Sequence, residues 1–352
     1  MLAERLRLAR TMAGLSMREL AEKAGISYQA VGFYEKRQRT PSSAVLLKLA
    51  KALGVRLEFF MRPATVSLSG MKFRQKQRRQ KRQSAKIKAQ IQDRIERYLL
   101  AESFVAIDDR PKLPQYAVQD MEEVEEVAKK WRRDWKLGFD PIENLVEMAE
   151  ARGVKVVLID APDCFSGCAV RADDSIPVLV VNKNLTECRF RLTFVHELAH
   201  LVVTGRPADW PEKKQEDLAY RLGEAFLVPD EAVYRELGPK RHRLDWAELR
   251  DLKFKYGLSM AAWIMRAAHL GIISENLKVS LFREMSQRKW RKNEPGDEET
   301  QERSNRFERL LLRAVAEDCI SEARAAEVYG GPLDNVRRQL MECGQDADTS
   351  GG

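Results

Sequence analysis

Apolar residues recur with a helical period along the first sixty residues, in short runs separated by glycine or serine. These runs predict four helices, over residues 2–13, 16–24, 27–35 and 42–53. Ser16 stands where it can cap the second helix, and Glu19, three places later, completes the capping-box pattern. Gly25 ends that helix, and Ser27 can cap the third. The front of the chain is therefore expected to be all-α, with two short helices joined by a tight turn.

A basic segment follows these helices. Residues 71–88 hold nine lysines and arginines and no acid. Ile87, Ile91 and Ile95 recur at helical spacing, which predicts a helix that leads into the next domain. A charge run is usually a solvated linker face, but a position next to a basic unit also indicates contacts with phosphates. Both interpretations stay open.

The middle of the chain mixes helical and strand-like patterns. These patterns predict helices over 121–135 and 141–151 and valine-rich strands over 154–159 and 177–181. An apolar stretch that begins near Thr186 predicts a buried helix, and the next amphipathic helix ends at Pro229. Residues 115–235 are therefore expected to form a small α+β domain with a short sheet.

The chain stays helical after Pro229. Helical spacing predicts further helices over 231–237, 244–256, 260–270, 307–318 and 321–329. The residues at the end of the chain are mostly small or polar, which is typical of a disordered tail. The expected parts are an all-α domain at 1–63, a basic linker and connecting helix at 64–114, the α+β domain at 115–235, a helical accessory region at 236–340 and the tail at 341–352. The predicted fold class is mostly α with one small α+β domain.

The composition fits a globular protein, since 44% of the 352 residues are hydrophobic. No apolar run approaches the length that spans a bilayer, and the first residues contain no apolar signal core. We therefore expect a cytoplasmic protein with no membrane partner. The five cysteines are odd in number and irregularly spaced, which argues against a disulfide framework. Cys164 and Cys168 are expected in a loop or hairpin.

The net charge of +8 conceals an asymmetry. Residues 1–92 carry 21 basic and five acidic residues, a balance of +16, whereas the remainder carries 40 basic and 48 acidic residues. A basic N-terminal part attached to an acidic remainder indicates that the N-terminal part binds a polyanion. Two short helices joined by a glycine-bearing turn fit a helix-turn-helix, so the expected partner is double-stranded DNA. The alternative is that this helical unit serves only for dimerisation.

The first domain resembles the XRE family of helix-turn-helix proteins, the lambda-repressor/Cro type. The matching residues are Leu15-Ser16-x-x-Glu19-Leu20-Ala21, Ala24-Gly25-Ile26-Ser27 and Thr40-Pro41-Ser42. The resemblance implies that the third helix enters the major groove of an operator and that a homodimer binds two half-sites. The residues expected to contact DNA are Arg18, Tyr28, Gln29, Phe33, Lys36, Arg37 and Arg39. Gln29 suits a base edge, whereas the cations suit phosphates.

The centre of the candidate chemistry is the stretch His196-Glu197-Leu198-Ala199-His200. Residues four apart share a helical face, so both imidazoles can point at one metal ion. Glu197 stands beside the first histidine, where it can deprotonate a water as general base. A lone buried histidine is usually a core residue, but here two of only four histidines flank a glutamate at this spacing. The pattern therefore predicts a metal site, and whether the metal does chemistry is a separate question.

Tetrahedral zinc needs a third protein ligand, which we expect on the following helix. Glu216 falls on the apolar stripe of that helix, and a carboxylate on a buried side needs a partner such as a cation. Glu212, Asp217 and Glu224 are competitors, of which the first precedes the helix and the others face elsewhere. Alternatively, Glu216 is a solvated surface acid.

This region resembles the ImmA/IrrE family of zinc metallopeptidases. The resemblance is carried by His196-Glu-Leu-Ala-His200, Glu216-x-x-Ala219, Phe226-Leu227-Val228-Pro229 and, upstream, Trp135-Lys-Leu-Gly138. It implies a zincin-like domain in which His196, His200 and Glu216 bind Zn²⁺ and Glu197 is the catalytic residue. Tyr220 departs from the pattern, because the family carries asparagine there. The departures remove neither a ligand nor the base.

The two resemblances together imply a DNA-binding transcriptional regulator with a zinc metalloendopeptidase domain. Its substrate is expected to be a repressor-type protein or the chain itself, cleaved within the basic linker. The alternative is a non-proteolytic repressor or antitoxin, in which the zinc domain is a sensor or binds a partner such as a toxin. A zinc-stabilised scaffold without DNA contact is a third option.

Overall fold

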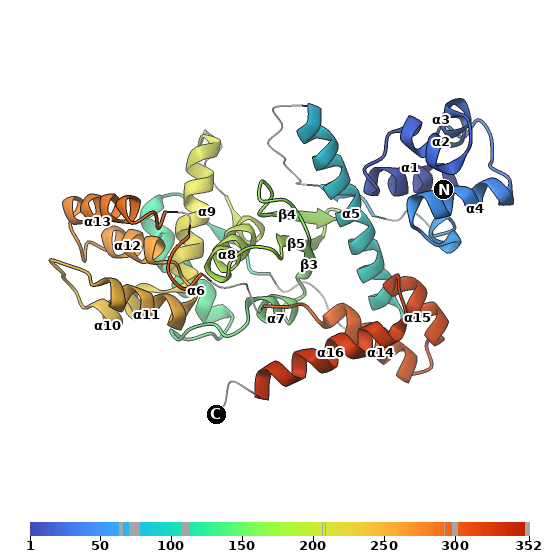
Figure 1. Cartoon of the computed structure of the whole chain (residues 1–352). Helices are drawn as coiled ribbons and strands as arrows, with labels where there is room; N and C mark the ends of the chain where they lie inside the picture. The colour runs from blue at the N-terminus through green and yellow to red at the C-terminus, as the bar shows by residue number, and fades with distance from the viewer. Residues whose placement is uncertain are drawn as a thin grey trace. The chain divides into compact units, whose positions relative to one another are not determined.

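The computed structural model describes residues 1–62, 66–69, 78–106, 113–205, 207, 209–291, 293–297 and 302–348, without the side chains of 78–80, 339 and 342–348. Within these residues the chain is mostly helical with a small mixed sheet, which confirms the predicted fold class (Figure 1). The chain divides into two compact units. Unit 1 comprises Met1–Asp108, Ala172–Ser175 and Asn305–Gly352, and unit 2 comprises Asp109–Arg171 and Ile176–Ser304.

Unit 1 begins with the predicted all-α segment. Its elements are α1 (Leu2–Met12), α2 (Met17–Ala24), α3 (Tyr28–Glu35), α4 (Ser43–Leu53) and the 3-10 turn η1 (Leu57–Phe60). The capping box forms as predicted: the Glu19 N–H donates to Ser16 Oγ, and the Ser16 N–H donates to the Glu19 carboxylate at 2.6 Å. Gly25 ends α2 with a φ of 61°, a left-handed conformation that glycine adopts without strain. Leu6, Leu20 and Val31 are fully buried in the shared core.

The second part of unit 1 is built on one long helix. This helix, α5 (Arg78–Ser103), packs against α1 (Figure 1). The other elements are β1 (Leu68–Ser69), α14 (Arg306–Ala316), α15 (Glu322–Tyr329) and α16 (Leu333–Asp348). Tyr98 of α5, Leu311 of α14 and Val328 of α15 share a second core. The predicted connecting helix is therefore present, and it shares its unit with the last three helices.

The end of the chain differs from its prediction. Helix α16 continues through Asp348, inside the segment that we expected to be a disordered tail, and residues 349–352 lie outside the described residues. The first half of α16 packs on the second core through Leu333, Val336 and Leu340, which recur at helical spacing. The expected accessory region 236–340 is likewise divided, since residues up to 304 belong to unit 2.

Unit 2 contains the predicted α+β region and the helices that follow it. Its elements are β2 (Tyr116–Ala117), η2 (Met121–Glu123), α6 (Val124–Asp134), α7 (Leu145–Glu150), β3 (Lys155–Ile159), β4 (Gly167–Ala172), β5 (Ile176–Asn182), α8 (Glu187–Val202), β6 (Val203–Thr204), α9 (Glu212–Leu227), α10 (Asp230–Leu237), α11 (Trp246–Tyr256), α12 (Met260–His269) and α13 (Glu275–Gln287). Strands β4, β5 and β3 are neighbours in this order, and β3 runs parallel to β5. Strands β2 and β6 form a separate parallel pair.

One local expectation in unit 2 is corrected by the structure and another is made more specific. The helix expected over 141–151 shortens to α7, because Pro141 lacks an N–H and Asn144 caps the helix by accepting from the Glu147 N–H. Cys168, expected in a loop or hairpin, lies in strand β4, which a short turn joins to its neighbour β5, and alternate residues of β4 are buried. Gly167 and Ala169 are small and half-exposed, so the alternation of apolar and polar residues that marks a strand is weak in this part of the sequence.

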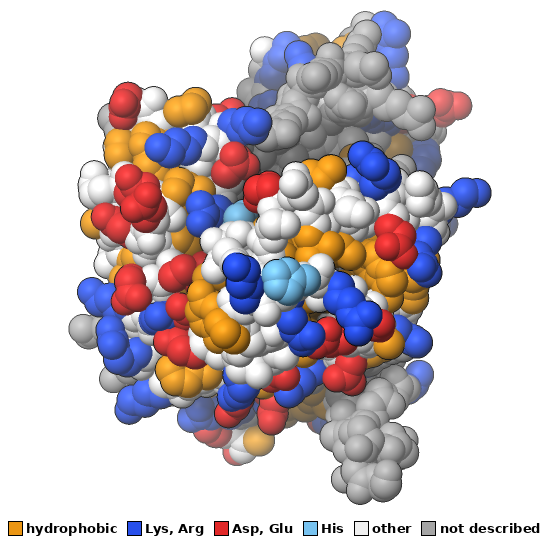
Figure 2. Space-filling model, turned by 90° about the vertical axis from the view of Figure 1, so that its left-hand side faces the viewer, with side chains coloured by type: hydrophobic (Ala, Val, Ile, Leu, Met, Phe, Trp, Pro, Cys, Tyr) orange, Lys and Arg blue, Asp and Glu red, His pale blue; other side chains and the backbone are white. Residues whose placement is uncertain are grey.

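Helix α8 lies at the centre of unit 2. It packs on β5 on one side and on α9 on the other (Figure 1), and Phe190, Phe194 and Leu198 are fully buried. Figure 2 views unit 2 from the side of α10–α13, where basic and acidic side chains are interspersed over the surface. Among the residues described, no helix combines the length and the apolar character needed to cross a membrane.

Candidate metal centre and DNA interface

Two histidines lie one turn apart on the face of α8 that meets α9. His196 is buried and His200 is partly exposed. Helix α9 approaches closely because residue 223 is glycine: a Cβ there would lie 3.0 Å from Val195 Cγ2 and 3.2 Å from the backbone nitrogen of His196. A larger residue would separate the helices. This close packing brings the first turns of α9 over the histidines.

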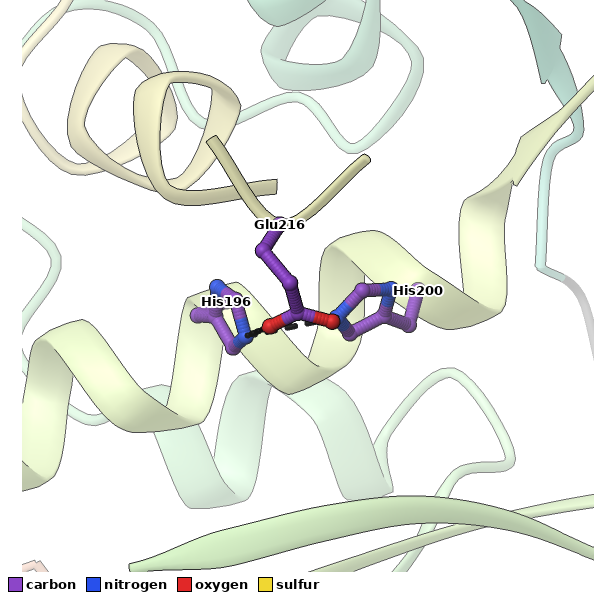
Figure 3. A group of neighbouring side chains, drawn as sticks. All are labelled: His196, His200 and Glu216. Carbon is purple, nitrogen blue, oxygen red and sulfur yellow. Dashed lines mark hydrogen bonds and ion pairs between the residues drawn. The ribbon is translucent and has the colours of Figure 1, made fainter. Parts of the chain in front are cut away.

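Glu216 reaches from α9 to both imidazoles (Figure 3). One carboxylate oxygen lies 3.3 Å from His196 Nε2 and the other lies 3.6 Å from His200 Nε2, and the two Nε2 atoms are 3.3 Å apart. Tetrahedral zinc with bonds of about 2.0–2.1 Å holds its donors about 3.3–3.4 Å from one another. Two neutral imidazoles and one carboxylate also form a common zinc donor set, so the residues fit the ion in both spacing and chemistry.

Burial keeps the imidazole of His196 in its neutral form. The pKa of its imidazole is lowered to about 3, first by burial and then by the neighbouring His200. The ring therefore stays neutral at physiological pH, and a neutral imidazole is the form that binds a metal. No residue that the structure describes hydrogen-bonds to its buried Nδ1. The ring of Tyr220 instead stacks on it, with 3.9 Å between centroids and 31° between planes.

Glu197 lies beside this cluster on the side of the sheet. The Ala169 N–H of β4 donates to its Oε2 at 2.9 Å. Burial raises the pKa of Glu197 to about 7, against the lowering effect of the Ala169 amide and with a further rise from the nearby charge of Glu216. A Cβ on Gly167 would lie 3.3 Å from Glu197 Cγ, so glycine leaves room for this side chain. A carboxylate with a pKa near neutrality can both accept and release a proton.

The competing acids lie elsewhere. Glu212, which was expected before the helix, is instead the first residue of α9, and both it and Asp217 are exposed. Glu224 is buried further along the helix. His269 Nδ1 lies 3.9 Å from the Glu224 carboxylate, and burial raises the pKa of Glu224 to about 7. Among the described residues, the only close group of three side chains that could hold a metal ion is formed by His196, His200 and Glu216. Glu216, the acid that the sequence favoured, is the one that lies close to both histidines.

The expected DNA contacts gather around α3. Tyr28 and Gln29 are exposed at its start, and the guanidinium of Arg18 on α2 lies 5.5 Å from the Tyr28 ring. Arg39 lies 4.9 Å from the ring of Phe33. Lys36 and Arg37 are exposed just after the helix.

One of these cations has a partner within unit 1. Arg37 forms an ion pair with Glu4 of α1, and its φ is 61°. Its guanidinium would have to give up this contact to reach a phosphate, so it is a weaker candidate than Lys36 or Arg39. These contacts stay predictions.

The comparisons with known proteins agree with this division of the chain. Residues 6–60 match the helix-turn-helix family model, and residues 149–267 match the model of the IrrE N-terminal-like domain. The chain therefore has the domains of a DNA-binding regulator and of a metallopeptidase-like protein. It joins an XRE-type helix-turn-helix domain to an IrrE N-terminal-like domain, which confirms the predicted fusion. No curated protein and no solved structure matches the chain.

Sequence reasoning missed two features of the site. The Ala169 amide that holds Glu197 lies on β4, and the alternation of buried Cys168, Val170 and Ala172 was the signal that could have revealed this strand. Tyr220 was noticed only as a departure from the family pattern. Its spacing of four residues from Glu216 places both on one helical face, and that spacing was available from the sequence.

Proposed function

We propose that the protein is a DNA-binding transcriptional regulator whose IrrE-like domain is a zinc-dependent metalloendopeptidase. Its substrate would be a repressor-type protein or the chain itself. The observation that carries the proposal is the set of three donors at zinc-like spacing, next to a half-buried carboxylate whose pKa is near 7. Together, these groups match what peptide hydrolysis requires from a protein.

Each residue has a distinct task in this proposal. His196, His200 and Glu216 would hold the ion, which supplies the electrophile that polarises the peptide carbonyl. Glu197 accepts a proton from the attacking water and then donates it to the leaving amine nitrogen. The Ala169 N–H fixes one oxygen of Glu197 and leaves the other for this transfer. Burial of Glu197 makes both halves of the transfer favourable near neutral pH.

The first experiment separates metal binding from chemistry. Zinc content would be measured for the wild type, Glu197→Gln and Glu216→Ala, and intact mass would then report cleavage of the chain and of candidate repressors. We expect Glu216→Ala to lose zinc, and Glu197→Gln to keep zinc but to lose cleavage by at least about 100-fold. Undiminished cleavage by Glu197→Gln would refute the mechanism.

The fused helix-turn-helix supports a second candidate function. In this view the protein is a non-proteolytic repressor or antitoxin that binds an operator as a homodimer, and its zinc domain is a sensor or binds a partner. Zinc bound through Glu216 without cleavage of any candidate, including the chain itself, would favour this function over the first.

A further inference from the structure

Helix α5 contributes an unusual charge pattern to unit 1. Between Glu58 and Asp93 the chain carries ten lysines and arginines and no acid. The first half of α5 contains six of these basic residues. Lys81, Ala85 and Lys88 follow one another at helical spacing and are exposed, so they form one stripe along the helix. We call Lys81 and Lys88 the α5 lysines. Neither forms an ion pair with a residue in the described part of the chain.

Buried ion pairs hold α5 against the helix-turn-helix domain. Arg5 of α1 pairs with Glu96 of α5, and both side chains are almost completely buried. Arg62, which follows η1, pairs with Asp93 at 2.7 Å. These two pairs join specific side chains of the two parts, so together with the packing of α5 on α1 they define how α5 lies on the domain. The α5 lysines are therefore carried at a defined place on the domain.

The part of α5 that follows Lys81 contacts the start of α2. Arg82 Nε donates to the Gly14 carbonyl at 2.8 Å, and its guanidinium pairs with Glu19 at 2.7 Å. Glu19 is the capping-box residue of α2, and Arg18 beside it is exposed. In a helix-turn-helix, α2 is the helix that crosses the DNA backbone while α3 enters the groove. The basic end of α5 thus adjoins the surface on which phosphates are expected.

We propose that the first half of α5 is a second DNA-contacting element, in which Lys81 and Lys88 bind backbone phosphates beside the crossing point of α2. This inference rests on the proposed DNA binding and extends it beyond the helix-turn-helix domain. A lysine provides a flexible point charge that suits a phosphate without reading the base sequence. The α5 lysines therefore add affinity and salt dependence, and they leave the choice of operator to α3.

The test compares three forms of the full-length protein on one probe. The forms are the wild type, Lys81→Gln/Lys88→Gln and the control Lys183→Gln/Lys240→Gln, which removes two exposed lysines of unit 2. Binding to a labelled mixed-sequence duplex would be measured by fluorescence anisotropy from low to high salt. Each lost phosphate contact makes the slope of the log association constant against log salt concentration shallower by about 0.9. This change corresponds to a loss of about eightfold in affinity at 0.1 M salt.

We expect the α5 variant to show a slope shallower by about two and the control to match the wild type. Equal slopes for the wild type and the α5 variant would overturn this inference and leave the helix-turn-helix proposal intact. An equal change in the control would also overturn it, because the effect would then be one of net charge. A wild type that binds no duplex at low salt would reject both proposals.

Discussion

Tyr220 lies one turn after Glu216 on α9, and its ring covers the imidazole of His196. Metal-binding histidines usually have their other ring nitrogen held by a hydrogen bond, which orients the ligand and raises metal affinity. In this site the Tyr220 ring stacks on the His196 imidazole, whose Nδ1 has no hydrogen-bond partner among the described residues. We therefore propose that Tyr220 helps to position His196, and it stands where the resemblance expects asparagine.

Replacing Tyr220 tests this role without relying on activity. We expect Tyr220→Ala to weaken zinc binding about 10- to 100-fold, the range seen when outer-shell partners of metal ligands are lost. Tyr220→Phe keeps the ring and should bind zinc nearly as the wild type does. Competition with a chromophoric chelator measures both affinities. Equal affinity for Tyr220→Ala and the wild type would show that the stack is incidental.

At the scale of elements, the contact between α8 and α9 decides whether the ligands meet. Gly223 lies in this contact, and a Cβ there meets the His196 backbone nitrogen at 3.2 Å. Alanine gains about 1 kcal/mol of helix propensity over glycine, whereas overpacking a close contact costs about 1–3 kcal/mol. The neighbouring atom belongs to the backbone and cannot rotate away. We therefore expect the overpacking cost to exceed the gain in helix propensity.

We therefore expect Gly223→Ala to lower the thermal stability of unit 2 and to weaken zinc binding, since α9 carries Glu216. Gly32→Ala provides the matched control, because a Cβ at this helical glycine of α3 meets nothing within 4 Å. That control should stabilise its own unit slightly. Differential scanning calorimetry with and without zinc measures both effects, and a stabilised Gly223→Ala variant would contradict the packing argument.

At the scale of the whole molecule, two compact units have separate hydrophobic cores. Leu311 is fully buried in the second core of unit 1, and Leu249 is fully buried in the core of unit 2. Zinc should raise the melting temperature of unit 2 alone, because a ligand stabilises only the structure that binds it.

Two core substitutions test this independence. Leu311→Ala and Leu249→Ala should each cost about 2–5 kcal/mol, but in different units. We expect Leu311→Ala to lower the transition that zinc does not shift, and Leu249→Ala to lower the one that zinc does shift. Calorimetry of each variant with and without zinc distinguishes them. A single transition affected equally by both would mean that the chain unfolds as one cooperative body.

The amino-acid sequence by itself determined what depends on neighbours along the chain. The helices α1 to α4, the capping box of Ser16 and the shared face of His196 and His200 follow from spacings of three and four residues, and local hydrogen bonds and helical geometry enforce these spacings. The two domain families were identifiable for the same reason, since their motifs are short and contiguous.

Tertiary structure decided what depends on residues far apart in sequence. The approach of Glu216 to both histidines, the amide of Ala169 at Glu197 and the ring of Tyr220 on His196 all depend on how α8, α9 and β4 pack. The association of the last helices with α5 depends on a contact across more than 200 residues, such as that of Arg97 with the Tyr329 carbonyl, 232 positions apart. No local pattern encodes such a pairing, because it is fixed by the fit of buried surfaces.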